Sequence, residues 1–520
     1  MQVFQTPCSH FRVAEGSCSI CRKLDELNGN IAGIKGFLEH AVEQRRAYLE
    51  EVNHCHDPIQ RLPVEIAAAV FSFCLPRPAS LDVFDVDEET RDDLAIHPIQ
   101  FLLGSVCRYW RQVVCSTPQM WNIIWVPISL CTPKVRSEIL AEWLARSGQL
   151  PLYVSMFYIG FDYEDEDDVP RPGTVAWSSI RCMMNMLYLN VNRMRVLHLS
   201  LLGPQFSCFE QLQDANPATG AATTTSCILD KLFIEVLDFA SPTFKLRSRV
   251  LSPTHVSLYR IEPEEVGIQW EHVTRVEAVD ILIDAALEIP KMAPRLQFLK
   301  LEHYDADEVG NNPPILHSSL KYLDFAAPSV LPNFLDFIKC PALEELSTRL
   351  YDDSVTLQNF IKRSECSLKK LTLVSPFNQQ LVSILRLTPS LTHLSLKNFR
   401  FPDDFLEIFK KTAYFEQGAF DRQGSFLPNL RSFTCTVDFT GFQWSTIASL
   451  IPHSRDDTKL VCRPLSEIVI ILMACEVERA TNYENITQIL DLARDGGVSL
   501  KITDAVGTDL TRPCQFLADE

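Results

Sequence analysis

A short apolar pattern recurs at a nearly constant interval through the second half of this chain. Leucine or a similar residue stands at its first, fourth and usually sixth positions, and successive copies begin 24, 23, 25 and 23 residues apart. The copies begin at Leu296, Leu320, Leu343, Leu368 and Leu391, with a last one at Leu430. One strand-plus-helix unit of this length cannot hide its own apolar side chains, whereas stacked units share a continuous core. The interval therefore predicts an α/β array with a curved parallel sheet.

Weaker copies of the pattern extend this array toward the N-terminus. They begin at Met194, Leu229 and Val273, so we place the array at residues 181–520, with a longer excursion between Leu391 and Leu430. Period and pattern together resemble those of leucine-rich repeats. The resemblance implies an irregular solenoid with a concave face lined by strands.

The repeated strands also predict a binding surface. Alternate residues of a strand point to opposite faces, so the residues between the apolar positions should line the concave side. We take as candidate partner contacts Phe298, Lys300, Tyr322, Asp324, Glu345, Lys370, Thr372, His393 and Ser395. Each is also compatible with an ordinary solvated strand residue. Phe298 and Tyr322 stand out, because large aromatics exposed on adjacent strands are often recognition anchors.

Two short amphipathic helices are predicted between residues 57 and 122. Pro63 suits the first turn of a helix, where its missing N–H and fixed φ do no harm. The apolar residues at helical spacing are Ile66, Val70, Phe71 and Leu75 on the first helix, and Val106, Trp110 and Val113 or Val114 on the second. These two helices are expected to bury their apolar faces together.

The residue order in this region resembles F-box-like modules found in large fungal protein families. It runs Leu62-Pro63-x-Glu65-Ile66, then Phe71, then Cys107-Arg108-x-Trp110-Arg111, then Ser116-Thr117-Pro118. In that family the module docks the Skp-type adaptor of a cullin-RING ubiquitin ligase. The resemblance implies an adaptor surface formed or supported by Leu62, Pro63, Ile66, Phe71, Cys107 and Trp110. An acidic insert at residues 76–98 is longer than compact F-boxes have, and it leaves open where the middle helix lies.

Residues 23–56 are expected to form a long amphipathic or coiled-coil helix. Apolar or small residues alternate in steps of three and four from Leu24 to Val52, interrupted only by Arg45. So narrow a seam favours pairing, either with a second copy through residues 24–52 or with another part of the same chain. Three glycines in this segment weaken the helix by about 1 kcal/mol each relative to alanine.

Residues 1–22 form a terminal segment with two possible interpretations: a disordered end of the chain, or a structural zinc site. Thiol and imidazole groups that zinc prefers are present at Cys8, His10, Cys18 and Cys21. The second Cys-x-x-Cys pair of a typical site is missing, so we assign no metal and no cofactor to the chain.

Composition excludes several classes of partner. With 48 Lys and Arg against 66 Asp and Glu, the net charge of -18 repels phosphate backbones and anionic lipid surfaces. The longest apolar run, at residues 468–475, is too short to cross a bilayer. Seventeen scattered cysteines are typical of reduced, buried thiols. We therefore expect no nucleic-acid or membrane partner, and a cytoplasmic or nuclear location.

A linking region at residues 123–180 joins the helical module to the array. Its apolar spacing predicts a helix at residues 137–147 and a strand at residues 150–154, followed by an acidic loop at residues 162–168. The alternation of a helix with a short strand is the same as in the later repeats.

The sequence contains none of the common phosphate-binding, hydrolase, zinc-protease or dinucleotide motifs, so we do not expect an enzyme. The leading hypothesis is a substrate receptor of a cullin-RING ligase, in which the F-box-like module joins the adaptor and the repeats capture a client protein. The alternative is a leucine-rich-repeat scaffold or sensor whose helical hairpin is only a structural cap. A hydrolase would require a cleft with paired carboxylates, or a Ser or Cys beside a His.

Overall fold

The computed structural model divides into two compact units, the first formed by residues 1–77, 93–122 and 144–148 and the second by residues 78–92, 123–143 and 149–520. It describes residues 19–75, 98–128, 133–158, 173–211, 225–238, 240–246, 249–302, 313–325, 332–349, 355–374, 381–398, 403–412, 414–416, 426–437, 448, 451, 460–472, 483–504 and 509. The acidic segments at residues 76–97 and 162–168, and Cys8, His10 and Cys18, lie outside these residues.

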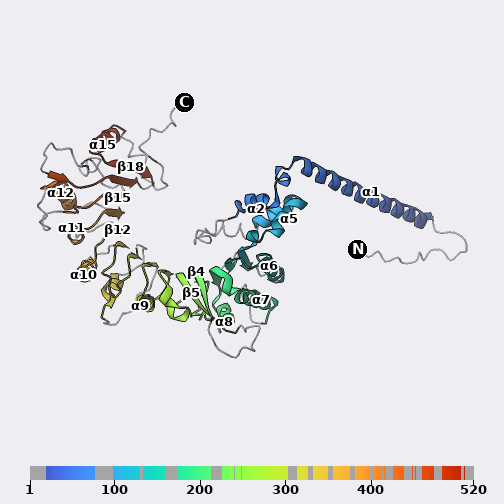
Figure 1. Cartoon of the computed structure of the whole chain (residues 1–520), viewed down its shortest axis with the longest axis horizontal. Helices are drawn as coiled ribbons and strands as arrows, with labels where there is room; N and C mark the ends of the chain where they lie inside the picture. The colour runs from blue at the N-terminus through green and yellow to red at the C-terminus, as the bar shows by residue number, and fades with distance from the viewer. Residues whose placement is uncertain are drawn as a thin grey trace. The chain divides into compact units, whose positions relative to one another are not determined.

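The first unit is helical (Figure 1). Its elements are α1 (Ser19–His56), η1 (Pro58–Arg61), α2 (Val64–Ser72), α4 (Ile99–Val106), α5 (Arg108–Ser116) and η2 (Pro118–Trp121). Helix α1 confirms the long helix predicted for residues 23–56. Helix α2 begins directly after Pro63, whose carbonyl accepts hydrogen bonds from the N–H groups of Ile66 and Ala67. We refer to α2, α4 and α5 as the hairpin.

The second predicted helix of the hairpin is wrong in one respect. Val106 and Trp110 do not share a helix, because Cys107 is fully extended (φ -156°, ψ 173°) and separates α4 from α5. The Cys107 sulfur accepts a hydrogen bond from the backbone N–H of Trp110 and so caps the start of α5. A break of one residue is enough to turn the apolar side chains of α4 and α5 in different directions.

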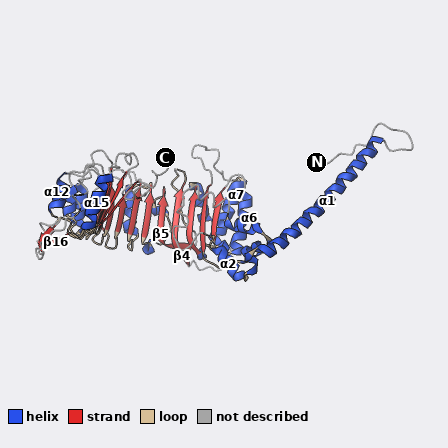
Figure 2. Cartoon of the chain, turned by 90° about the horizontal axis from the view of Figure 1, so that it is seen from above, coloured by secondary structure: helices blue, strands red, loops and turns tan. Residues whose placement is uncertain are grey.

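The second unit is an α/β structure that contains a 14-stranded parallel sheet. Figure 2 shows its strands side by side in one row. Their order is β1 (Ile123–Ile128), β2 (Leu152–Tyr158), β3 (Met194–Leu201), β4 (Thr225–Val236), β5 (Arg249–Tyr259), β6 (Arg275–Val279), β7 (Phe298–Glu302), β9 (Tyr322–Phe325), β11 (Glu345–Arg349), β12 (Lys370–Val374), β13 (His393–Lys397), β15 (Ser432–Val437), β17 (Glu467–Leu472) and β18 (Ser499–Asp504). Two further pairings join β10 (Ile338–Lys339) to β8 (Ile315–Leu316) and β14 (Tyr414–Glu416) to β16 (Leu460–Cys462).

Helices occupy most of the connections, as parallel neighbours require a crossover. The α-helices are α6 (Pro133–Arg146), α7 (Val175–Leu189), α8 (Gly203–Gln211), α9 (Ile283–Met292), α10 (Val355–Ser364), α11 (Leu381–Arg386), α12 (Asp403–Lys411) and α15 (Tyr483–Asp495). Shorter 3-10 turns are η4 (Val191–Arg193), η5 (Pro263–Glu265), η6 (Trp270–His272) and η7 (Pro332–Phe337). The predicted helix at residues 137–147 and the strand at residues 150–154 correspond to α6 and β2.

The repeated apolar pattern coincides with the buried positions of the sheet. Its first, fourth and sixth residues are buried in the copies that begin at Leu296, Leu320, Leu368, Leu391 and Leu430. Register then aligns equivalent residues across strands, so that Leu323, Leu346, Leu371 and Leu394 form one buried row. The helices pack apolar side chains on the same core, among them Phe360 of α10 and Ile384 of α11.

The sheet begins earlier than predicted. Strands β1 and β2 are its first two members, so the sheet starts at Ile123 and not near residue 181. Three strands of the sheet inside the array were also missed: β5, β17 and β18. Strand β5 has Pro253 where the first leucine of the pattern would stand, and β17 follows Leu465 with Ile468 and Ile470.

Candidate functional site

Helix α2 presents an apolar stripe to solvent. Ile66 is 50% exposed, Val70 39%, and Phe73, just beyond the helix, 82%. Their spacing of four and three residues places them on one face. The opposite face is buried through Ala67 and Phe71. The expectation that both helices bury all their apolar side chains is therefore wrong for Ile66 and Val70. We call Ile66, Val70 and Phe73 the α2 stripe.

Helix α4 is exposed in a similar way. Phe101, Leu102 and Val106 are about half exposed, whereas Leu103 and Gly104 are buried. Seven large apolar side chains of the hairpin, counting Val64, are thus in contact with water. Scattered apolar residues are normal on protein surfaces, but such a concentration on short helices is typical of an interaction surface.

A groove of about 450 Å³ runs beside α2. One wall is formed by Val64, Glu65, Ala68, Ala69 and Ser72 of the helix, and the other by residues 116–119 at the start of η2. The side chains of Ala68 and Ala69 are single methyl groups, so they leave the space beside the helix open. The groove could receive an apolar side chain of a bound protein.

Phe71 and Trp110 hold α2 against α5. Their ring centroids are 4.7 Å apart, and Phe71 is fully buried. The Trp110 indole N–H donates to the Asp57 carboxylate at 2.6 Å, and the same carboxylate accepts from the Ile59 N–H at 2.9 Å. Asp57 therefore links the end of α1 to the hairpin core. Sequence reasoning missed this residue, although an aspartate directly before a proline is a common start of a turn or helix.

The six residues implied as the adaptor surface divide into two groups. Pro63 and Ile66 are exposed, and the carbonyl of half-buried Leu62 accepts a hydrogen bond from the Tyr109 hydroxyl at 3.2 Å. Phe71 and Trp110 instead join α2 to α5, and the Cys107 sulfur accepts a bond from the Gln60 amide of η1 at 3.7 Å. The first group can contact a partner, and the second group holds the first in place.

The residues that the sequence predicted on one face of the sheet do share a face in the second unit. In β7, β9 and β11 the residues between the buried apolar positions are half-buried, and in β12 and β13 Lys370 and His393 are exposed. Register aligns them into rows that cross the strands. The first row is Arg275, Phe298, Tyr322, Glu345, Lys370 and His393, and the second is Glu277, Lys300, Asp324, Ser347, Thr372 and Ser395. We call these two rows the polar face.

Aromatic stacking organises the centre of the polar face. The rings of Phe298 and Tyr322 are parallel to within 6°, with centroids 4.2 Å apart. The Arg275 guanidinium lies over the other side of the Phe298 ring at 3.7 Å. Both interactions favour a fixed geometry, since aromatic pairs and cation–π contacts each contribute about 1 kcal/mol. A partner would therefore meet a rigid aromatic edge.

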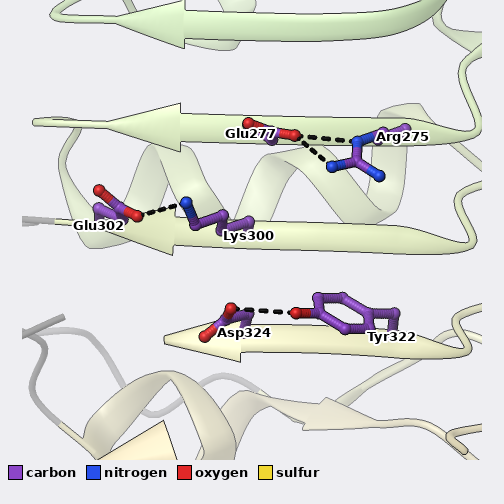
Figure 3. A network of polar contacts seen from close by, with 6 residues as sticks. All are labelled: Arg275, Glu277, Lys300, Glu302, Tyr322 and Asp324. Carbon is purple, nitrogen blue, oxygen red and sulfur yellow. Dashed lines mark hydrogen bonds and ion pairs between the residues drawn. The ribbon is translucent and has the colours of Figure 1, made fainter. Parts of the chain in front are cut away.

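Polar side chains on this face form three pairs along single strands (Figure 3), and a fourth pair crosses from β12 to β11. Arg275 donates to Glu277 at 2.7 Å, Lys300 pairs with Glu302 at 2.6 Å, the Tyr322 hydroxyl donates to Asp324 at 3.1 Å, and Lys370 pairs with Glu345 at 3.0 Å. Burial, followed by the Asp324 carboxylate, raises the pKa of Tyr322 to about 12. Burial alone would lower the pKa of Lys300, but the bond to Glu302 and the carboxylates of Glu277 and Asp324 raise it overall. Near neutral pH both groups stay protonated.

One serine does lie beside a histidine, as a hydrolase would require. The Ser155 hydroxyl is 2.8 Å from Nδ1 of His198, on the neighbouring strands β2 and β3. Both side chains are buried, with exposed fractions of 0% and 3%, and the His198 ring packs edge-on against Phe233. A substrate cannot reach this pair, and its hydrogen bond satisfies two polar groups inside the core.

Within the described ranges, His, Cys, Asp and Glu side chains do not gather in threes as a metal site. Cys21 lies in α1, but its side chain is outside the described set, so the zinc alternative is not tested. Among the described helices none combines the length and apolarity needed to cross a bilayer.

Comparison with protein-family models and with curated proteins finds no match for this chain.

Proposed function

We propose that this protein is a non-catalytic substrate receptor of a cullin-RING ubiquitin ligase. In this proposal the hairpin resembles an F-box and docks a Skp-type adaptor, and the second unit resembles a leucine-rich-repeat array that binds a client protein on its polar face. Ubiquitin transfer would take place on other subunits of the ligase.

The observation that carries the proposal is the exposure of the α2 stripe. A helix of nine residues buries Ala67 and Phe71, with Phe71 packed on Trp110 of α5, and leaves Ile66, Val70 and the following Phe73 in water. Exposing three large apolar side chains together costs solubility unless a partner covers them. The stripe follows the Leu62-Pro63 turn, the position at which the family resemblance locates the adaptor contact.

The polar face supports the receptor role in a different way. Its strands are held by buried leucines, so the outward residues can vary without loss of the core. Phe298 and Tyr322 offer an aromatic anchor, and the flanking ion pairs offer polar contacts around it. This arrangement has the anatomy of a protein-binding surface, with a central aromatic group and a polar rim.

Co-purification with a Skp-type adaptor tests the proposal. We expect Ile66→Asp to abolish adaptor binding, because the substitution puts a charge in the centre of an apolar contact. Val355→Asp is the matched control, since Val355 is equally exposed and also lies in the first turn of a helix. The double variant Leu62→Ala, Pro63→Ala should also lose the adaptor.

Equal adaptor binding by wild type and by Ile66→Asp would contradict the assignment. The alternative of a leucine-rich-repeat scaffold or sensor, with the hairpin as a structural cap, would then be preferred.

A further inference from the structure

The long helix α1 presents an uncovered apolar seam. Each of its described side chains is exposed except that of Ala41, which is half-buried. The seam has the a and d positions of a heptad: Leu24, Leu27, Ile31, Ile34, Leu38, Ala41, Arg45, Tyr48 and Val52. Its large apolar members are between 43% and 68% exposed. Contacts with the hairpin lie near the end of the helix, where Glu50 pairs with Arg108 at 2.9 Å.

The length of the seam limits what can cover it. From Leu24 to Val52 it runs for about 43 Å at 1.5 Å per residue. The next longest helix among the described residues is α7, with 15 residues. A partner that covers four heptads must therefore be another helix of similar length. Among the described residues of this chain, α1 is the only helix that long. An isolated helix containing three glycines is also marginal in water without such a partner.

We propose that α1 pairs with the α1 helix of a second copy of this chain, in an antiparallel coiled coil. The charges along the helix favour this orientation. In an antiparallel pair with Ile34 opposite Leu38 of the second copy, Lys23 of each chain lies beside Glu51 of the other, at both ends of the dimer. Lys35 then lies beside its own counterpart, but an exposed like-charge pair is weak in water.

Arg45 gives a second reason for the orientation. A parallel, in-register dimer would place Arg45 against Arg45 of the second copy at the centre of the seam. The antiparallel pair places it opposite Leu27, so that its guanidinium can extend to water along its own stem. The glycines Gly29, Gly33 and Gly36 fall on the outer side of the helix, and a Cβ built on any of them meets no atom within 4 Å. They leave the seam undisturbed.

This proposal does not depend on the adaptor or the client. Light scattering and sedimentation equilibrium on the full chain test it. We expect a mass twice that of the 59.1 kDa chain for the wild type, and the monomer mass for Ile34→Asp, Leu38→Asp. The control Gly29→Ala, Gly33→Ala should keep the dimer and tighten it several-fold, because it strengthens the helix without changing the seam. A monomeric wild type, or a dimer that persists in the Ile34→Asp, Leu38→Asp variant, would overturn the proposal.

Cysteine cross-linking tests the orientation separately. Phe37 flanks the midpoint of the antiparallel pair and lies beside Phe37 of the second copy. Phe37→Cys should therefore form a cross-linked dimer under mild oxidation, above the background of the native cysteines in the wild type, and Arg45→Cys should not. Cross-linking of Arg45→Cys without cross-linking of Phe37→Cys would show a parallel pair and overturn the antiparallel arrangement.

Discussion

Strands β1 to β3 and strands β7, β9 and β11 differ in how deeply the outward side chains are buried. Register places Val196 of β3 in the same row as Phe298 of β7 and Tyr322 of β9. Val196 is 1% exposed, whereas Phe298 and Tyr322 remain partly in water. Strands β1 to β3 are buried on both faces, and β7, β9 and β11 on one face.

The two groups of strands also differ in the kind of polar side chain at their outward positions. The outward polar residues of β2 and β3 include no Asp, Glu, Lys or Arg, and Ser155 and His198 form a hydrogen bond with each other. The equivalent positions of β7 and β9 carry the charged Lys300 and Asp324. A neutral hydrogen-bonded pair can be buried at small cost, but a charge cannot. Alternation alone therefore does not predict exposure, whereas charged outward residues such as Lys300 and Asp324 indicate a face that is open to water.

Val196→Lys should give the largest effect. An unpaired ammonium group would be buried in β3, and we expect a loss of about 4 kcal/mol in the free energy of unfolding. His393→Lys, in the same row on β13, should change it by less than about 0.5 kcal/mol because His393 is exposed. Urea unfolding of both variants measures the difference, and similar losses would remove the distinction between the two regions.

Substitutions on the two faces of β7 should differ by a smaller amount in their effect on the free energy of unfolding. Leu299→Ala removes a fully buried side chain and should destabilise the protein by about 3 kcal/mol. Phe298→Ala removes one aromatic stack and one cation–π contact, and we expect a loss of about 1 kcal/mol. Thermal unfolding gives both values. If Phe298→Ala cost more than Leu299→Ala, the polar face would be part of the core.

His255, between the two regions on β5, should give a pH-dependent effect. Burial lowers its pKa below 6.5, and the positive charges of Arg275 and Lys231 act in the same direction. The folded chain then binds a proton less readily than the unfolded chain, so this contribution to stability is present above about pH 6.5 and is lost as the pH falls toward the folded pKa. His255→Gln should lose less stability than the wild type when the pH is lowered from about 7 to about 5. A parallel decline in both proteins would argue against it.

The ion pair of Lys370 with Glu345 should give the smallest effect. The Lys370 side chain is 51% exposed and that of Glu345 35%, so water screens the pair, and Lys370→Met should change the free energy of unfolding by less than about 0.5 kcal/mol. Any effect on client capture would then arise from lost contacts and not from lost stability. A destabilisation of several kcal/mol would show that the pair is structural.

The sequence predicted the parts of the fold that depend on local periodicity. The leucine pattern identified the middle strands because each copy contains its own buried residues, and the three-and-four spacing identified α1. Strand β5 was missed because Pro253 replaces the first leucine, and β17 because isoleucine replaces leucine after an interval of 35 residues from Leu430. The positions of both strands depend on pairing with neighbouring strands, and a local sequence pattern cannot show that pairing.

The candidate site was predicted in part for a similar reason. The outward residues of β7 to β13 follow directly from alternation, and the structure confirms that they lie on one face. The division of the hairpin residues could not be read from spacing, since Phe71 is buried by Trp110, 39 residues further along the chain. Asp57 was overlooked because its partner, the Trp110 indole, is 53 residues away.

The Asp57 carboxylate also sets a limit on how the hairpin can be isolated. Trimming the chain to the recognisable motif, from Leu62 onward, would discard the acceptor of the Trp110 indole along with the turn that follows α1. In the remaining fragment the Trp110 indole N–H would lack its carboxylate acceptor, and Trp110 would hold Phe71 less firmly. Fragments meant for binding studies should begin upstream of the aspartate.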